Sequence, residues 1–331
     1  MFKFTIMLTR PQVIVPFGFA IGLFFGAVAT RGIDWTDVST QLSAASPMAV
    51  GIALGLVLIS AYLRALRWRF LFVGHPARTA RLFLVENASL GLNNVSPIRL
   101  LDEPAMLAML TLRDRIPGPL VVATLVMSRM QDLGVTLLLA AVSLTVEPTL
   151  SARAVPAIVA GLAFVVVLGT LLNVGWLSRR FTLMRRIPGV NTYDEAVTML
   201  LSRKRRLSGT VMLTAAYWLV LGPMAYVLAD GMGVELSMLQ STILIFGAIF
   251  FATAMPGLPG ALGTFEVAVV ELASIWGVPQ ALALGYGLVL HLVVFLPPVV
   301  IALFVLPREG LSFLGKPRTT SPHAPKDTFT S

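Results

Sequence analysis

Residues 236–276 read LSMLQSTILIFGAIFFATAMPGLPGALGTFEVAVVELASIW. The stretch is apolar enough to enter a membrane, but prolines and glycines interrupt it at residues 256–264, PGLPGALGT. Each half is too short to cross comfortably, because a spanning helix requires about 20 mostly apolar residues. Non-helical backbone at membrane depth is tolerated only where protein or a water-filled cavity covers it. We therefore predict that this stretch forms a re-entrant helical hairpin inside a membrane domain.

A second apolar stretch is broken in the same way. It runs from Leu82 to Thr111 and is interrupted by NNVSPIR at residues 93–99. Six other stretches are continuous and long enough to span. They are Pro11–Thr30, Pro47–Leu63, Gly118–Val146, Ala154–Trp176, Ser208–Ala229 and Pro279–Leu306. The sequence thus predicts an all-α polytopic membrane helix bundle with six full spans and two re-entrant hairpins, eight segments in all.

The first of these segments also resembles a secretory signal. Lys3 and Arg10 precede it, and Ala27-Val28-Ala29 is similar to a cleavage site. Its charge-free run is longer than the apolar core of a usual signal peptide. We expect an uncleaved first helix, with cleavage as the alternative. The membrane domain is then expected over residues 1–307, followed by a disordered cytoplasmic tail over 308–331, which is polar and rich in Pro, Ser and Thr.

Composition agrees with a membrane protein. The chain is 56% hydrophobic and 12% charged, whereas soluble proteins carry roughly 25% charged residues. It has no cysteine, which excludes disulfides, thiolate catalysis and cysteine metal sites. We found no catalytic motif, and we expect neither a metal nor another cofactor. The net charge of +9 is distributed between the apolar segments, which indicates membrane topology and anionic lipid rather than nucleic acid.

The positions of the basic residues predict the orientation. If the N-terminus is inside and each hairpin returns to its starting side, most of the 25 basic residues face the cytoplasm, and the outer loops hold only Arg31 and Arg153. Both termini are then cytoplasmic in the cell membrane. The two hairpins enter from opposite sides, which is compatible with an inverted repeat. The basic loop Arg179–Arg206 either lies on the inner leaflet and binds anionic lipid, at about 1 kcal/mol per basic residue, or serves topology alone.

Ionisable groups within a membrane are costly and call for a partner or a wet cavity. Arg129 and Asp132 lie mid-way along a spanning segment and share one helix face at this spacing. They form a buried ion pair that fixes packing, or Arg129 holds an anionic headgroup, because its planar fork suits phosphate. After the first break, Arg99, Asp102 and Glu103 either reach cytoplasmic water or form the polar floor of a cavity.

The second break offers a different kind of candidate site. Glycines at 257, 260 and 263 permit close backbone approach, and the exposed amides of such a turn could bind an anion. Thr264 is a candidate N-cap, which would place Glu266 in the first helical turn, where the helix dipole stabilises it. Capping and substrate binding both remain open for Glu266. His291 is alone among Leu and Val, and is either a packed, hydrogen-bonded histidine or a proton relay.

The stretch PGLPGALGTFE at residues 256–266, followed by an apolar run with a Gly277-Val278-Pro279 turn, resembles a family signature. The family is the flippase-like transmembrane domain related to lysylphosphatidylglycerol synthase. Arg67-Trp68-Arg69, the segment Asn94–Glu103 and the segment Arg129–Asp132 agree with it, so the resemblance covers roughly residues 10 to 307. It implies an eight-segment fold with two re-entrant elements, and movement of an aminoacylated or otherwise modified phospholipid between leaflets.

The chain departs from the family pattern at several positions. Asp102-Glu103 replaces the usual Gly-Glu, Met106 or Leu107 replaces an arginine, and Ser128 replaces a glutamate. The resemblance therefore does not fix the headgroup preference of this chain. Only a short tail follows Leu306, so we expect the membrane part alone, without the soluble synthase domain.

Three functions remain open from the sequence. A lipid translocator, which binds a membrane phospholipid, suits the intramembrane charges and broken helices best. A transferase acting on a polyprenyl-phosphate-linked sugar is disfavoured, because the outer loops are short. An accessory scaffold subunit of a membrane lipid enzyme and a homo-oligomer also remain open. The predicted substrate-binding residues are Asn94, Arg99, Glu103, Arg129, Asp132, Pro256, Gly257, Gly260, Gly263 and Glu266.

Overall fold

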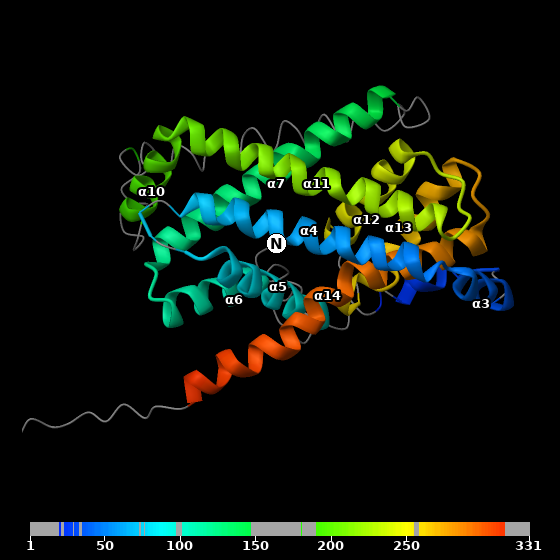
Figure 1. Ribbon diagram of the computed structural model, residues 1–331, viewed down its shortest axis with the longest axis horizontal. Coiled ribbons are helices and arrows are strands. Elements are labelled where there is room, and N and C mark those ends of the chain that lie inside the picture. The colour runs from blue at the N-terminus through cyan, green and yellow to red at the C-terminus, as the bar shows by residue number, and fades with distance from the viewer. Residues whose placement is uncertain are drawn as a thin grey trace, which may run out of the picture.

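The computed structural model describes most of the chain, and the described residues form helices with no strand among them (Figure 1). The described residues are 20, 23–28, 30–32, 35–72, 74–75, 77–96, 101–146, 180, 190–254 and 258–314. The helices are α3 (Trp35–Ala44), α4 (Pro47–Leu71), α5 (Thr79–Val95), α6 (Asp102–Ala108), α7 (Gly118–Val146), α10 (Val190–Ser202), α11 (Lys204–Asp230), α12 (Met238–Ala254), α13 (Thr264–Ile275) and α14 (Gln280–Leu314). A π-helical turn, η1 (Met109–Arg113), extends α6, and a short 3₁₀ turn, η4 (Pro259–Ala261), precedes α13.

Within these ranges, four helices are long and apolar enough to cross a membrane. They are Pro47–Leu71, Gly118–Ser143, Lys204–Asp230 and Gln280–Gly310, and Met238–Thr253 is a shorter apolar helix. The four coincide with four of the predicted spans, which confirms a multi-pass, all-helical membrane protein. The predicted span Ala154–Trp176 and most of Pro11–Thr30 lie outside the described residues.

The two broken stretches each form two helices that contact each other. α5 ends at Val95 and α6 begins at Asp102, and these helices are in contact. α12 ends at Ala254 and α13 begins at Thr264, and these helices also pack together. The interruptions therefore fall where the sequence predicts them, although residues 97–100 and 255–257 lie outside the described part.

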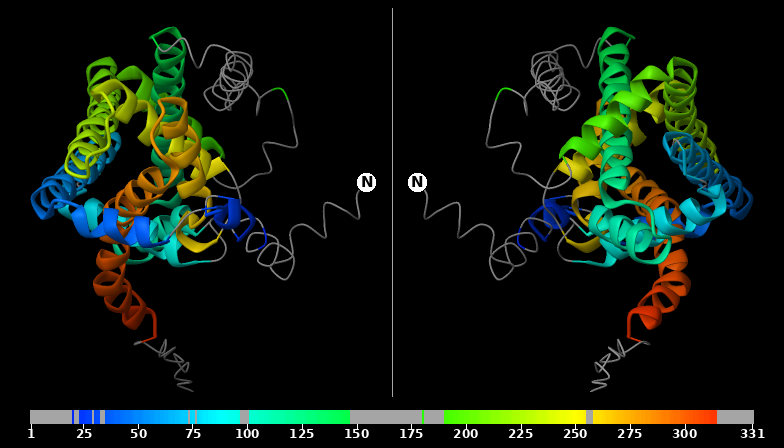
Figure 2. Two further views of the ribbon diagram at one scale, coloured as in Figure 1. Left: turned by 90° about the vertical axis from the view of Figure 1, so that its right-hand side faces the viewer. Right: turned by 90° about the vertical axis from the view of Figure 1, so that its left-hand side faces the viewer.

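Two apolar clusters hold the bundle together. The larger one lies among α4, α11, α12, α13 and α14 and contains Phe265 and Tyr286, both fully buried. The smaller one lies among the C-terminal half of α4, α5, η1 and α7 and contains Trp68 and Leu82. α4 runs alongside α11, and α14 runs alongside α5 (Figure 2). α4 contributes to both clusters, so it connects the two halves of the bundle.

Helices α5 and α14 pack tightly against each other at Gly91. A Cβ atom at this position would lie 2.1 Å from the carbonyl oxygen of Pro298 and 2.6 Å from the Cβ of Ala302. The first of these atoms belongs to the backbone, which cannot rotate away. Glycine is therefore required here by close helix packing, a use of small residues that is frequent between membrane helices.

We predict that Gly91→Ala destabilises the protein by about 1–3 kcal/mol, as overpacking of a tight core does. The change should be visible as a lower melting temperature of the detergent-solubilised protein. The control is Gly55→Ala on α4, where a Cβ would meet no atom within 4 Å. Equal melting temperatures for both variants would contradict the packing argument.

Helix α14 extends beyond the predicted end of the membrane domain. It continues to Leu314, so residues 308–314, which we expected to be disordered, are helical. Glu309 is buried and pairs with Arg81 at 2.7 Å and with Arg113 at 3.3 Å. Arg81 also pairs with Asp114 at 3.0 Å. These ion pairs attach the end of α14 to α5 and η1; residues 315–331 lie outside the described part.

Candidate functional site

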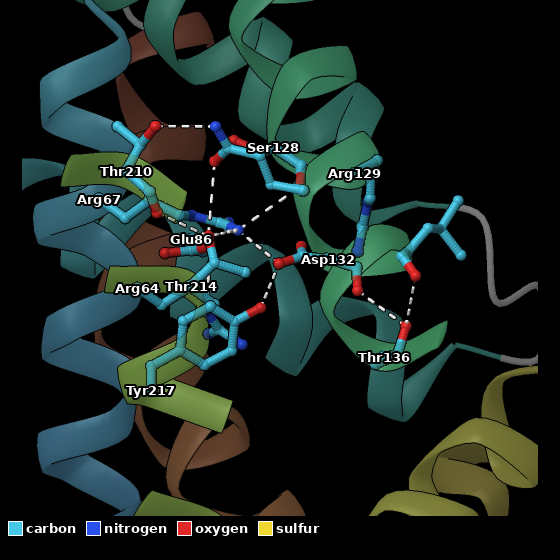
Figure 3. Close-up of polar contacts among 12 residues, drawn as sticks. Arg64, Arg67, Glu86, Ser128, Arg129, Asp132, Thr136, Thr210, Thr214 and Tyr217 are labelled. Atoms are coloured by element: carbon cyan, nitrogen blue, oxygen red, sulfur yellow. Dashed lines mark hydrogen bonds and ion pairs between the residues drawn. The ribbon is translucent and has the colours of Figure 1, made fainter. Parts of the chain in front are cut away.

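A buried ionic network connects three of the spanning helices (Figure 3). Arg67 of α4 is 2% exposed and pairs with Asp132 of α7. Tyr217 of α11 donates its hydroxyl to the same carboxylate, and the Arg67 guanidinium lies 5.2 Å from the centre of the Tyr217 ring. The carboxylate of Asp132 therefore receives a cation from one helix and a hydroxyl from another, which fixes the three helices in one arrangement.

Further polar groups of the same helices, and one more ion pair, extend this network. Arg67 donates to the Ser128 carbonyl at 3.4 Å and to the Thr214 hydroxyl at 3.5 Å. Gln131 donates to Thr210 at 2.7 Å, and Thr214 donates to Gln131 at 3.4 Å. One turn earlier on the same face of α4, Arg64 pairs with Glu86 of α5 at 2.9 Å. We refer to Arg64, Arg67, Glu86, Asp132 and Tyr217 as the central network.

The structural role of Arg67 differs from the predicted one. We predicted that the span ended at Leu63 and that Arg67 faced the cytoplasm, but α4 continues to Leu71. A signal was present in the helical periodicity, because Ser60, Arg64 and Arg67 lie on one face. Ser60 donates to the Tyr217 carbonyl at 2.9 Å, so this face is a polar stripe that contacts α5, α7 and α11.

The predicted pair of Arg129 and Asp132 does not form. Arg129 instead pairs with Asp102 and Glu103 of α6, each at 2.7 Å, while Asp132 pairs with Arg67. The prediction is wrong because α7 lies between α4 and α6 and contacts both. Side chains three residues apart on α7 then find nearer partners on different helices.

We refer to Arg129, Asp102 and Glu103 as the exposed triad, because it opens to the protein surface. The side chain of Arg129 is 46% exposed and that of Glu103 is 48% exposed, whereas Asp102 is 11% exposed. Asp102 and Glu103 each accept a hydrogen bond from the Arg129 guanidinium, and about half of the side chains of Arg129 and Glu103 stays exposed. One cation and two anions at this place can receive a group that carries both charges. Arg99 lies outside the described residues.

The turn before α13 brings together four other predicted residues. Glu266 accepts a hydrogen bond from the Gly263 amide at 2.7 Å, so Gly263 is the N-cap. The prediction of Thr264 as N-cap is therefore wrong; Thr264 is the first helical residue and donates to the Ala261 carbonyl at 2.9 Å. Gly260 and Gly263 have φ angles of 69° and 83°, which favour glycine because it has no Cβ.

The end of α5 meets this turn and α14. Asn94 donates to the Phe295 carbonyl at 3.3 Å, and a Cβ on Gly260 would lie 3.4 Å from the Asn94 carbonyl oxygen. Nδ1 of His291 lies 2.7 Å from Oε1 of Glu266. Asn94, Gly260, Gly263, Glu266 and His291 thus form one group, which we call the turn cluster. Pro256 and Gly257 lie outside the described residues.

The predicted site residues are therefore divided among three places. Arg129 and Glu103 belong to the exposed triad, Asp132 belongs to the central network, and the remaining described residues belong to the turn cluster. Within the described ranges, no three His, Asp or Glu side chains gather as a metal site would require.

A family model described as the lysylphosphatidylglycerol synthase TM region matches residues 15–302. The chain belongs to this family. The match covers all three groups of residues, and it confirms the resemblance drawn from the sequence motifs. No curated protein matches the chain. Membership of the lysylphosphatidylglycerol synthase TM-region family indicates a membrane protein related to lipid modification or transport.

Proposed function

We propose that this protein moves a phospholipid, or another anionic or aminoacylated lipid, between the leaflets of the cell membrane, and that the exposed triad receives the headgroup. The observation that carries the proposal is the exposure of Arg129 and Glu103 within a bundle of membrane-spanning helices. Charged groups in contact with hydrocarbon are costly. A polar headgroup bound to these side chains would shield them from hydrocarbon and remove that cost. The exposed charges therefore favour binding of a lipid headgroup.

The triad suits a headgroup that carries both signs of charge. A phosphate would bind the outward side of the Arg129 guanidinium, which presents several donors in a fixed fork. An ammonium group would bind Glu103, while Asp102 keeps Arg129 in position. The acyl chains stay in the surrounding lipid. The site contains two carboxylates and one guanidinium, so it favours a headgroup with a cationic group over a purely anionic one.

The remaining polar groups support this role in a different way. The central network holds α7, which carries Arg129, against α4 and α11. The two broken stretches act as re-entrant hairpins from opposite sides, so that each brings a loop to membrane depth. Transporters with inverted repeats place their substrate between such elements. Both termini are then cytoplasmic. The mechanism requires no catalytic step and no cofactor.

Reconstitution tests the function directly. The purified protein is placed in liposomes with fluorescent phosphatidylglycerol, aminoacylated phosphatidylglycerol and phosphatidylethanolamine, one lipid at a time. We expect faster exchange between leaflets than in protein-free liposomes, with the highest rate for a lipid that carries an ammonium group. Equal rates with and without protein for every lipid would overturn the proposal. If exchange required a stoichiometric co-purified partner, an accessory role would replace it.

We also propose that the basic loop Arg179–Arg206 binds anionic lipid of the inner leaflet. Its described part contains α10, which packs on α7 and buries Val197. Arg203, Lys204, Arg205 and Arg206 follow as a continuous exposed run at the start of α11. Basic residues near a membrane surface are attracted by anionic headgroups.

We predict that replacing these four residues by glutamine lowers the affinity for phosphatidylglycerol by about fivefold for each charge removed at low salt, so that less of this lipid remains bound after purification. Native mass spectrometry measures the bound lipid, and the effect should shrink at high salt. Arg31→Gln, on the predicted outer side, is the control. If the variant with all four substitutions retained as much lipid as the unaltered protein, these residues would serve only to set the topology.

A further inference from the structure

Glu266 and His291 form a buried pair inside the turn cluster. Their side chains are 6% and 8% exposed, and Nδ1 of His291 lies 2.7 Å from Oε1 of Glu266. The imidazole is enclosed by aromatic rings, with the centre of Phe265 at 5.1 Å and that of Phe295 at 4.4 Å. An isolated charge in such surroundings is unfavourable. A carboxylate beside a neutral imidazole has a net charge of −1. The pair becomes electrically neutral when it binds one further proton.

No other charged group compensates this pair among the described residues that pack on α14. α5 presents Asn94, and its charged residues Arg81 and Glu86 are paired with Glu309 and Arg64. The remaining ionisable groups on the neighbouring helices lie elsewhere. Glu271 of α13, Asp37 of α3 and Asp230 of α11 are exposed, and the α4 residues Arg64 and Arg67 belong to the central network. Among the described residues, the protonation state of Glu266 and His291 therefore decides the local charge.

The same carboxylate also holds the backbone of the turn. Its second oxygen accepts the Gly263 amide at 2.7 Å. The turn includes Ala261, whose φ of 65° lies in the left-handed region that residues with a Cβ disfavour. The conformation of the turn thus depends on Glu266, whose other oxygen lies beside His291 without a hydrogen bond between them.

We propose that Glu266 and His291 form a proton-binding site that couples the turn at residues 258–263 to the proton concentration. With the proton bound, the pair is neutral and the turn stays packed between α5 and α14. When the proton leaves to water, an uncompensated carboxylate remains in apolar surroundings, and movement of the turn that admits water becomes favourable. The proton site itself does not depend on the proposed function. Only the further consequence, that lipid movement responds to protons, rests on that function.

The first test measures the turn without reference to lipid transport. The chain has no cysteine, so Leu262→Cys, at a side chain that is 49% exposed, introduces a single label site in the turn. The rate of reaction with a thiol reagent is divided by the rate for Ser39→Cys on α3, which cancels the intrinsic effect of pH on thiols. We expect this ratio to rise several-fold as the pH increases, and to be independent of pH when His291→Gln is added.

Glu266→Gln provides a second variant, because a glutamine oxygen can still accept the Gly263 amide. It should also give a constant ratio, and gel filtration verifies that both variants remain folded. A ratio that does not change with pH in the protein with native Glu266 and His291 would overturn the proton site, whether or not lipid moves.

The second test compares lipid exchange in liposomes with and without an imposed proton gradient. We expect the gradient to change the rate in the unaltered protein and not in His291→Gln. A rate of lipid exchange that does not depend on the proton gradient would overturn the coupling of lipid movement to protons. A pH-dependent labelling ratio without any lipid exchange would support the proton site and overturn the transport function instead.

Discussion

Asp132→Leu is expected to destabilise the protein by about 3–5 kcal/mol, the cost of removing one partner of a buried ion pair. The substitution leaves the Arg67 guanidinium, 2% exposed, with long hydrogen bonds to Ser128 and Thr214 and the ring of Tyr217, but with no carboxylate partner among the described residues within hydrogen-bond distance. Arg67→Leu should cost less, because Asp132 is 18% exposed and keeps the hydroxyl of Tyr217. The measurement is the midpoint of unfolding in a detergent mixture, followed by circular dichroism.

The double variant distinguishes an ionic interaction from two independent effects. If Arg67 and Asp132 stabilise the fold through each other, Arg67→Leu combined with Asp132→Leu should be more stable than the sum of the single changes predicts. Arg69→Leu serves as the control, since Arg69 is exposed and makes one long bond to Thr79 at 3.4 Å. Its effect should stay within about 0.5 kcal/mol. Strict additivity in the double variant would contradict the network.

Arg129→Ala is expected to abolish measurable lipid exchange and to leave membrane insertion intact. The side chain is half exposed, so its contribution to folding is modest. Its contribution to binding is larger, because a hydrogen bond to a charged group is worth about 1.5–3 kcal/mol, which corresponds to about tenfold or more in affinity. The substitution also leaves Asp102 and Glu103 without their cation, and two carboxylates repel a phosphate.

Arg113→Ala is a closely matched control. Arg113 is 44% exposed and also pairs with a carboxylate, that of Glu309, but it lies on η1 rather than on a spanning helix. It should retain lipid exchange. Arg129→Lys should recover only part of the activity, because lysine keeps the charge but lacks the planar fork. Exchange at the unaltered rate in Arg129→Ala would refute headgroup binding at the triad.

The amino-acid sequence by itself determined the class of the protein and the places where its helices break. Both depend on local properties. Long apolar segments exclude water as the main solvent, and the prolines and glycines within 96–99 and 256–264 disfavour a continuous helix. The predicted spans over 118–146 and 208–229 therefore agree with α7 and with most of α11.

Only the tertiary structure decided which charges meet. The spacing of Arg129 and Asp132 indicates a shared helix face, but the packing of α4 and α6 on either side of α7 gives each residue a different partner. His291 likewise lies beside Glu266, which belongs to another helix. Ion pairing acts over a few ångströms in space, whatever the separation along the chain. The contacts that define the candidate sites therefore follow from how the helices pack, which local sequence patterns do not specify.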